Sequence, residues 1–495
     1  METSVTNQIH QQEQVEGESS CEHSNRDLST LVDECDDCHD IQEILRVASD
    51  LSGDGERFKL RFPKTWDVSG HYLASVSQRF LESRNTRCQL CLILGKSRIS
   101  NASPEGNYVN EDTDELRALP FAQVCKLVRN INAIKDPSFA LLIGPRRAFR
   151  DIRDLYPVVE NGIAVLSKPQ GTSNLVTPRT VPEYYDPAMV RAWIQYCQKY
   201  HKFCLPRSSI VEGMKLINCD TRVIGPAADS DKYVALSYVW GKSNVHSNCN
   251  TQRVTGSQEL PASLPRVIGD AISVTKSLGY RFLWVDKLCI DQKDPNTRHT
   301  QIQQMHIIYE KAELALIAAC GADRNNALAG VSTPRIGMQI NLGKAAISWV
   351  IDPQHLVRHS HWSKRGWTFQ EAVLARRRLL FTKQQVYFEC NAMNCCENLH
   401  TPLDSLHVKD KSRIRVLFRA GLFDCQTQFG KMNPIDLSVD ELWARYCVCV
   451  EDYSKRELTY DADALNAFQG IIQRVRSRES KSLAEVFTER FLPFS

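Results

Sequence analysis

The chain has 495 residues, which is too long for a single hydrophobic core, so two or three domains are expected. Its 61 basic and 58 acidic residues leave a net charge of +3, which excludes the strongly basic surface typical of proteins that bind nucleic acid or acidic membranes. The sequence shows no apolar run long enough for a membrane span and no secretory signal, so we expect a cytoplasmic protein whose 18 cysteines are reduced thiols.

The first part of the chain changes from polar to mixed character. Residues 1–26 are polar and rich in Gln, Glu and Ser, which predicts disorder. Residues 27–205 are predicted to form a mixed α/β region. The runs "FALLIG" (139–144) and "GIAVLS" (162–167) are typical of buried strands. Residues 186–204 are predicted to form a helix, because a capping aspartate and a proline precede apolar residues three and four positions apart.

The middle third alternates short apolar runs with amphipathic segments. Residues 233–238, 281–286 and 314–319 are apolar almost throughout, which predicts strands that are covered on both faces. The segments 264–279 and 299–312 separate them and place apolar residues on one helical face. This alternation predicts a parallel βαβαβ sheet with helices on both of its faces.

Aromatic and acidic residues follow the ends of these predicted strands. Tyr238, Trp240 and Gly241 come directly after the first strand, whereas Asp286 ends the second and Asp291 lies just beyond it. In an open parallel sheet, ligands bind at the carboxyl ends of the strands, so these residues are predicted to line a ligand-binding crevice. The alternative is that the two aspartates only cap the following loop.

Several long blocks of the sequence resemble one known family. The blocks are "YVALSYVWG", "LWVDKLCIDQ", "QIQQMHIIYEKA" and "RGWTFQEAVLARRRLLFTKQQVYFEC", and they occur in this order. Together they resemble the HET (heterokaryon incompatibility) domain of filamentous fungi, and flanking segments extend the resemblance over roughly residues 190–472. The resemblance implies a HET domain at 206–390 with a TIR-like α/β core. It also implies a mainly helical region at 391–495, so that α-rich N- and C-terminal regions flank the core.

The resemblance also implies a function. HET-domain proteins act in non-self recognition and trigger programmed cell death when incompatible fungi fuse. We therefore expect an effector that acts through protein partners, with the HET domain as a candidate surface for homo-oligomer formation. Because some TIR domains cleave NAD with a glutamate, a second hypothesis is an NAD glycohydrolase that takes NAD as substrate and uses Glu371. A third is a HET-derived fold kept as a non-catalytic scaffold.

The segment "WTFQE" holds the candidate catalytic glutamate. Trp367 and Glu371 are four residues apart, and this spacing resembles that around the catalytic glutamate of certain TIR enzymes. On a helix the two side chains share a face, so that the ring can stack on a nicotinamide or adenine while the carboxylate reaches the ribose. Asp286 is the second candidate catalytic residue. The alternative is a core tryptophan beside a glutamate that is ion-paired with Arg365 or Arg376.

Cysteine and histidine residues form a candidate zinc site. Cys88 and Cys91 have Cys-x-x-Cys spacing, while His201 and Cys204 follow Cys197 on the predicted helix. Two cysteines with a second Cys/His pair make up a tetrahedral zinc site, so Cys88, Cys91, His201 and Cys204 are the predicted ligands. The alternative is that these cysteines are buried and act as small apolar residues.

Three other stretches of the sequence give weaker or purely structural predictions. Cys35 and Cys38 form a weaker candidate pair of ligands, and Cys390, Cys395 and Cys396 are predicted to be structural. The basic stretch "ARRRLL" (375–380) is predicted to lie on a solvated rim of a helix or strand, and the alternative is that Arg376 to Arg378 bind a phosphate.

Overall fold

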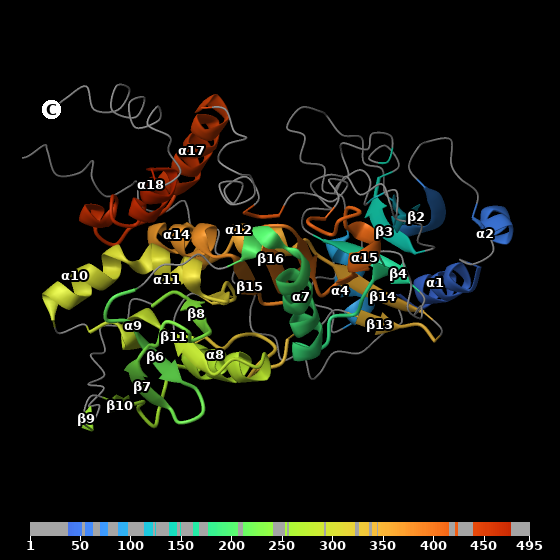
Figure 1. Ribbon diagram of the computed structural model, residues 1–495. Helices are drawn as coiled ribbons and strands as arrows, with labels where there is room; N and C mark the ends of the chain where they lie inside the picture. The colour runs from blue at the N-terminus through green and yellow to red at the C-terminus, as the bar shows by residue number, and fades with distance from the viewer. Residues whose placement is uncertain are drawn as a thin grey trace, which may run out of the picture.

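The structure is a computed structural model of the whole chain (Figure 1). It describes residues 38–51, 55–62, 70–77, 88–97, 113–121, 124, 138–145, 149, 162–167, 177–205, 211–240, 253–254, 257–291, 294–321, 326–335, 339–343, 345–414, 421–423 and 439–476. The segment 1–26, which was predicted to be disordered, lies outside these residues. Within the described ranges, none of the helices has the length and apolar character needed to cross a membrane.

The first sheet has six strands, and every neighbouring pair in it is antiparallel. In spatial order its strands are β1 (His71–Ser77), β2 (Thr113–Pro120), β3 (Phe139–Gly144), β4 (Ile163–Ser167), β14 (Ala346–Val350) and β13 (Gln339–Asn341). The two strands predicted at 139–144 and 162–167 are therefore confirmed. This sheet corrects the expectation of an α-rich N-terminal region. That expectation failed because β1 and β2 mix polar with apolar residues, so neither forms an apolar run, and because they pair with each other across about 40 residues of sequence.

Helices α1 (His39–Leu51), α2 (Gly55–Arg61) and α4 (Gln89–Lys96) accompany this sheet. Leu45 of α1 and Ile93 of α4 are fully buried, and they pack with Leu73, Ala164 and Ile347 of the strands in one apolar core. The segment therefore contains a hydrophobic core of its own. It extends to β13 and β14, which come much later in the chain.

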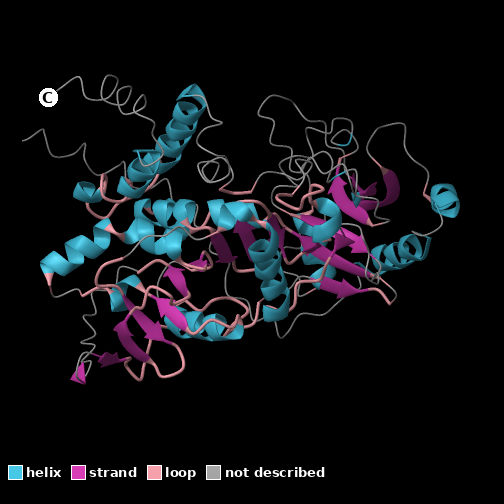
Figure 2. Cartoon of the chain, in the orientation of Figure 1, coloured by secondary structure: helices cyan, strands magenta, loops and turns pink. Residues whose placement is uncertain are grey.

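The second sheet is larger and has ten strands (Figure 2). In spatial order its strands are β17 (Asn394–Cys396), β16 (Val386–Cys390), β15 (Arg377–Phe381), β12 (Leu314–Ala318), β8 (Tyr233–Ser237), β11 (Phe282–Trp284), β6 (Lys215–Asn218), β7 (Val223–Pro226), β10 (Ser257–Glu259) and β9 (Arg253–Val254). A small third sheet pairs β5 (Thr177–Pro178) with β18 (Leu399–His400).

The centre of the ten-stranded sheet is parallel, whereas its two sides are antiparallel. Strand β8 pairs in parallel with β11 on one side and with β12 on the other, and β12 pairs in parallel with β15. The prediction that the runs at 233–238, 281–286 and 314–319 form adjacent parallel strands is confirmed. The pairs from β6 to β9 and from β15 to β17 are antiparallel, so the fold as a whole is mixed α/β.

Helix α7 (Pro187–Tyr200) precedes the strands of this sheet in the chain. The helices between the strands of the parallel centre are α8 (Arg266–Ser277), α9 (Asp286–Cys289), α10 (Pro295–Gln303), α11 (Met305–Lys311), α12 (Pro353–Arg358), α13 (His361–Lys364) and α14 (Gly366–Leu374). The Asp186 side chain caps α7, as the sequence predicted, and a short 3-10 turn at Lys202–Cys204 follows the helix. The single helix predicted at 299–312 is instead divided at Gln304 into α10 and α11.

The helices cover both faces of the parallel strands. Helix α8 lies on one side of β8 and β11, and α11 and α14 lie on the other (Figure 1).

A second apolar core joins the two large sheets. It contains Leu142 and Val165 of the first sheet together with Ile317, Leu380 and Phe369 of the parallel centre and α14. The six-stranded sheet therefore packs directly against the region that carries the candidate site.

The arginines at 376–378 are buried, so the prediction of a solvated rim was wrong. Arg378 donates to the carbonyl oxygens of Ala372, Val373 and Ala375 at the end of α14. Arg376 donates in the same way to the last carbonyls of α11. The last carbonyls of a helix have no partner within the helix, and a guanidinium supplies both donors and a favourable charge there. These arginines thus fix where α11 and α14 end.

The C-terminal part of the described chain contacts α14 through its last two helices. It contains α15 (Leu403–Leu406), α17 (Val439–Ser454), a 3-10 turn (Asp461–Asp463) and α18 (Gln469–Arg476) in addition to β17 and β18. The Gly366 amide donates to the Glu457 carbonyl over 2.8 Å, and the Phe369 and Phe468 rings stack. The division of the chain at residues 26, 205 and 390 stays a prediction.

Candidate functional site

A chain of hydrogen bonds lies at the carboxyl end of β8. Ser237 is the last residue of that strand, and its hydroxyl donates to the carboxylate of Glu371 on α14. The Trp362 indole N–H donates to the Ser237 Oγ over 2.7 Å. Alternate residues of a strand face opposite sides of the sheet, so Ser237 points to the same face as Tyr233, whose hydroxyl bonds to α11. Two neutral donors, the Trp362 indole and the Ser237 hydroxyl, thus form a hydrogen-bonded chain that ends at the Glu371 carboxylate.

Burial controls the protonation of Glu371. Its side chain is only 5 % exposed, and among the described residues no Arg or Lys forms an ion pair with it. The pKa of Glu371 is raised to about 7, first by the loss of hydration on burial and second by the nearby charge of Asp286. The Ser237 hydrogen bond and the positive charge of Arg365 oppose this increase. The alternative prediction was an ion pair of Glu371 with Arg365 or Arg376, and the described residues do not form this ion pair.

Asp286 lies close to this hydrogen-bonded chain, at the first position of α9. Its carboxylate accepts the Trp240 indole N–H over 2.9 Å and the Lys287 backbone N–H over 2.6 Å. Burial raises the pKa of Asp286 to about 6, although both hydrogen bonds and the Arg365 charge act against the increase. We call Ser237, Asp286 and Glu371 the carboxyl cluster. Its two acids have pKa values near neutral pH, as general acid or base groups require.

The remaining predicted residues divide into two groups. Trp240 is half-buried beside Asp286, whereas the Tyr238 ring is buried in the apolar core. That these residues line a ligand-binding crevice stays a prediction. Trp367 is half-buried, and its indole N–H donates to Asp463 of the C-terminal segment over 3.3 Å. Asp291 is half-buried and follows α9. Gly241 lies outside the described residues.

Three site residues were missed by sequence reasoning. They are Ser237, Trp362 and Tyr309, whose hydroxyl donates to the Leu236 carbonyl over 3.0 Å and acts on the pKa of Glu371. Ser237 could have been noticed from the sequence, since it is the one small polar residue in a strand of apolar and aromatic residues and its buried hydroxyl needs a partner. Nothing in the sequence around Trp362 or Tyr309 distinguishes them from core aromatics.

The predicted zinc ligands occur in two separate groups. Cys88 and Cys91 lie with Cys38 beneath the six-stranded sheet, and the Cys38 and Cys88 sulfurs are 3.4 Å apart. His201 and Cys204 lie at the end of α7. There they join Cys197 and Cys390 in what we call the sulfur cluster, whose four ligand atoms are all within 4.8 Å of one another. The predicted combination of Cys88 and Cys91 with His201 and Cys204 is therefore wrong, because different sheets hold the two halves. Cys35 lies outside the described residues.

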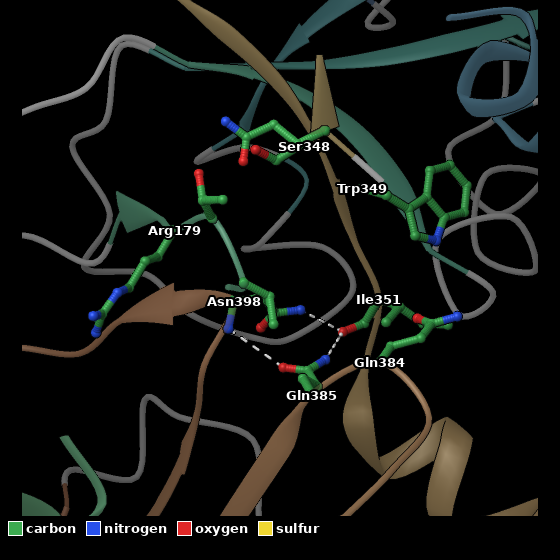
Figure 3. A pocket seen from close by; sticks show the side chains of 10 residues that line it. Arg179, Ser348, Trp349, Ile351, Gln384, Gln385 and Asn398 are labelled. Atoms are coloured by element: carbon green, nitrogen blue, oxygen red, sulfur yellow. Dashed lines mark hydrogen bonds between the residues drawn. The ribbon is translucent and has the colours of Figure 1, made fainter. Parts of the chain in front are cut away.

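A small cavity between the sheets is distinct from the carboxyl cluster (Figure 3). Its lining includes Gln385 and Asn398, whose side-chain amides both donate to the Ile351 carbonyl, over 3.0 and 2.6 Å. Arg179 and Trp349 also contribute to its wall. The lining contains no carboxylate, thiol or imidazole, so it lacks the acid–base groups present in the carboxyl cluster.

The fold and the site together define a mixed α/β protein with buried acids at the carboxyl edge of parallel strands. Residues 233–371 match the family described as "Heterokaryon incompatibility protein (HET)". The matched segment begins at the first residue of β8 and ends at Glu371, so the likeness to the HET family covers β8, β11 and β12 of the parallel centre and most of α14.

Two further comparisons describe how far this likeness extends. The chain is 30% identical over 100 residues to Heterokaryon incompatibility protein 6, OR allele, from Neurospora crassa. That match covers 19% of this chain and 15% of the relative's own length. No solved structure matches the chain.

Proposed function

We propose that this chain acts in heterokaryon incompatibility, as a cytoplasmic effector of programmed cell death that responds to non-self through protein contacts. The HET segment supports this role, as does the likeness to a protein named for heterokaryon incompatibility. Contacts between HET domains of two copies are part of the proposal.

The proposed core is TIR-like. Four parallel strands in the order β11, β8, β12, β15, with helices on both faces, support this assignment. In such a sheet the functional groups gather at the carboxyl edge of the strands. The carboxyl cluster lies at that edge, with Ser237 at the end of β8 and Asp286 just after β11.

One observation carries the proposal that this edge is functional. Glu371 is buried without an ion-pair partner among the described residues, and its carboxyl titrates near neutral pH. A buried charge of this kind destabilises the folded protein, so a chain that needs only a stable core does better with an apolar residue there. Strongly shifted acids of this kind concentrate at functional sites.

The second candidate function is cleavage of the nicotinamide–ribose bond of NAD. The specific observation in its favour is the pair of acids beside a half-buried indole, since Trp240 bonds to Asp286 next to Glu371. The indole face offers a stacking surface for a base. The ionised Glu371 carboxylate would stabilise the positive charge that develops on the ribose as the bond breaks.

Expression of the full chain in a filamentous fungus tests both functions. Wild-type protein, Glu371→Gln and the control Glu259→Gln would be induced to equal abundance, and cell death and free nicotinamide would be measured. Glu259 is exposed on β10 and undergoes the same chemical change away from the site. We expect Glu371→Gln to lose killing and Glu259→Gln to keep it.

The nicotinamide readout then separates the two candidates. Release of nicotinamide by wild-type protein and its loss in Glu371→Gln would favour the enzyme. Killing by wild-type protein without any change in NAD would favour an effector that acts through contacts alone. Normal killing by Glu371→Gln would contradict a functional role for the carboxyl cluster.

A further inference from the structure

The sulfur cluster has the composition and spacing of a structural metal site. Cys197, His201, Cys204 and Cys390 each direct one potential ligand atom to a common point, and all four side chains are buried. In a tetrahedral zinc site with Zn–S bonds of about 2.3 Å, the ligand atoms are separated by roughly 3.5–4 Å. The ligand atoms of the sulfur cluster therefore need only a small adjustment of their side chains to reach this spacing.

Hydrogen bonds fix the tautomer of His201 that a metal needs. The His407 Nδ1 is 2.6 Å from the Leu403 carbonyl, which can only accept, so this nitrogen carries the proton. The Nε2 of neutral His407 is then an acceptor, and it takes the proton of His201 Nε2 over 3.1 Å. His201 Nδ1 is left with a free lone pair, 3.4 Å from the Cys390 sulfur. The other ring nitrogen of a metal-bound histidine is usually held by such a second partner.

The surroundings of the sulfurs suit thiolates. The Arg377 Nε–H donates to the Cys197 sulfur over 3.1 Å, and the Ala392 backbone N–H donates to the Cys390 sulfur over 3.5 Å. Three thiolates and one neutral imidazole around a divalent ion carry one net negative charge, which the Arg377 guanidinium balances. Such donors are of little use to neutral thiols in an apolar core.

We propose that Cys197, His201, Cys204 and Cys390 bind one structural Zn²⁺ ion. Three thiolates and an imidazole are soft and borderline ligands that favour zinc over magnesium or calcium, and four protein ligands close the coordination sphere. Each thiol releases its proton to solvent as its sulfur binds the ion. The inference is independent of the proposed function.

The site would join two parts of the chain that are distant in sequence. Three ligands come from α7 and the turn that follows it, and Cys390 comes from the end of β16. Strand β16 pairs with β15, which follows directly after α14 and its Glu371. The ion would therefore lock the segment that precedes the HET domain to the strands that support the carboxyl cluster.

Elemental analysis of the purified full-length chain tests the proposal. We expect one zinc ion bound by this site in wild-type protein, and its loss in Cys204→Ser and Cys390→Ser. Two controls should keep it: Cys395→Ser, which removes a buried thiol outside the cluster, and the double variant Cys88→Ser/Cys91→Ser, which breaks the other sulfur group. Retention of the zinc by Cys390→Ser would overturn the assignment.

X-ray absorption at the zinc edge tests the ligand set even if Cys204→Ser and Cys390→Ser fail to fold. In the Cys88→Ser/Cys91→Ser background we expect three sulfur ligands and one nitrogen ligand. A different ligand set, or protein that stays free of zinc when produced with excess zinc, would contradict the proposal.

A variant of His407 tests the hydrogen-bonded histidine pair. His407→Phe keeps a ring against His201, on which His407 now stacks with centroids 5.2 Å apart, but removes the Nε2 acceptor. We expect zinc affinity to fall by about 10–100-fold, as when other outer partners of zinc ligands are removed. An unchanged affinity would show that the pair does not position His201.

Discussion

The core around the HET segment contains two buried polar clusters with opposite chemistry. In the carboxyl cluster, burial leaves two acids near neutral pKa, with hydrogen bonds but no ion pair on Glu371 among the described residues. In the sulfur cluster, the thiols stay neutral in the absence of metal, because burial raises the pKa of Cys197 to about 12. Neutral thiols are easily buried, whereas carboxylates are not. This difference supports the proposed functional role of the carboxyl cluster and the proposed stabilising role of the sulfur cluster.

Metal removal gives the largest expected effect and acts on the sulfur cluster alone. Binding of structural zinc supplies about 10–16 kcal/mol in small zinc domains. We therefore expect a strong chelator to lower the free energy of unfolding of this chain by several kcal/mol, and excess zinc to restore it. Thermal unfolding with and without chelator is the measurement. If the chelator leaves the midpoint of thermal unfolding unchanged, the sulfur cluster holds no stabilising metal, and the proposed difference in role between the two clusters fails.

The parallel centre of the fold could be predicted from sequence because its signals are local. Each of the runs at 233–238, 281–286 and 314–319 is apolar at nearly every position, and the helices between them have a clear apolar face. The Asp186 cap and its following proline mark the start of α7 in the same way. Such patterns depend on neighbouring residues alone, so no knowledge of the rest of the chain is needed.

The features that were missed depend on contacts between distant residues. Cys390 completes the sulfur cluster from a strand far along the chain, and no spacing rule connects it to Cys204. The basic stretch at 376–378 was expected at the surface because arginine is rarely buried, but the carbonyls at two helix ends provide its partners. Ser237 and Trp362 became site residues only when α14 and β8 came together.

The carboxyl cluster predicts a dependence of stability on pH. The pKa of Glu371 is about 7 in the folded chain and 4.5 as its ordinary value, so the folded state holds this proton more tightly. The cost of burying the charge is absent below pH 4.5, grows as pH rises through this window and is complete above pH 7. The shift corresponds to on the order of 3 kcal/mol.

Denaturant unfolding at pH 5 and pH 8 measures this slope. Asp286→Asn should flatten it, because the Asp286 charge is one of the causes that raise the pKa of Glu371. The variant also removes the titration of Asp286 itself, whose pKa is about 6, and this loss adds to the flattening. The remaining titrating groups are common to both proteins and cancel in the difference between their curves. A slope that is the same in Asp286→Asn and wild type would show that the two acids are not coupled.

A smaller effect is expected at the edge of the carboxyl cluster. Trp240→Phe keeps an aromatic ring but removes the N–H donor to Asp286. We expect a loss of about 1.5–3 kcal/mol in the free energy of unfolding, the usual range for a hydrogen bond to a charged group. A loss of 3–5 kcal/mol, measured by denaturant unfolding, would indicate that Trp240 is a core residue.

The most direct test of the central claim is the free energy of unfolding of Glu371→Gln at pH 8, relative to wild type. Glutamine keeps the size of the side chain and an acceptor for Ser237, but it removes the buried charge. We predict that the variant is at least as stable as wild type, because a functional carboxylate is held at a cost to stability. A loss of about 3–5 kcal/mol would instead identify Glu371 as a structural partner of buried positive charge and contradict the account.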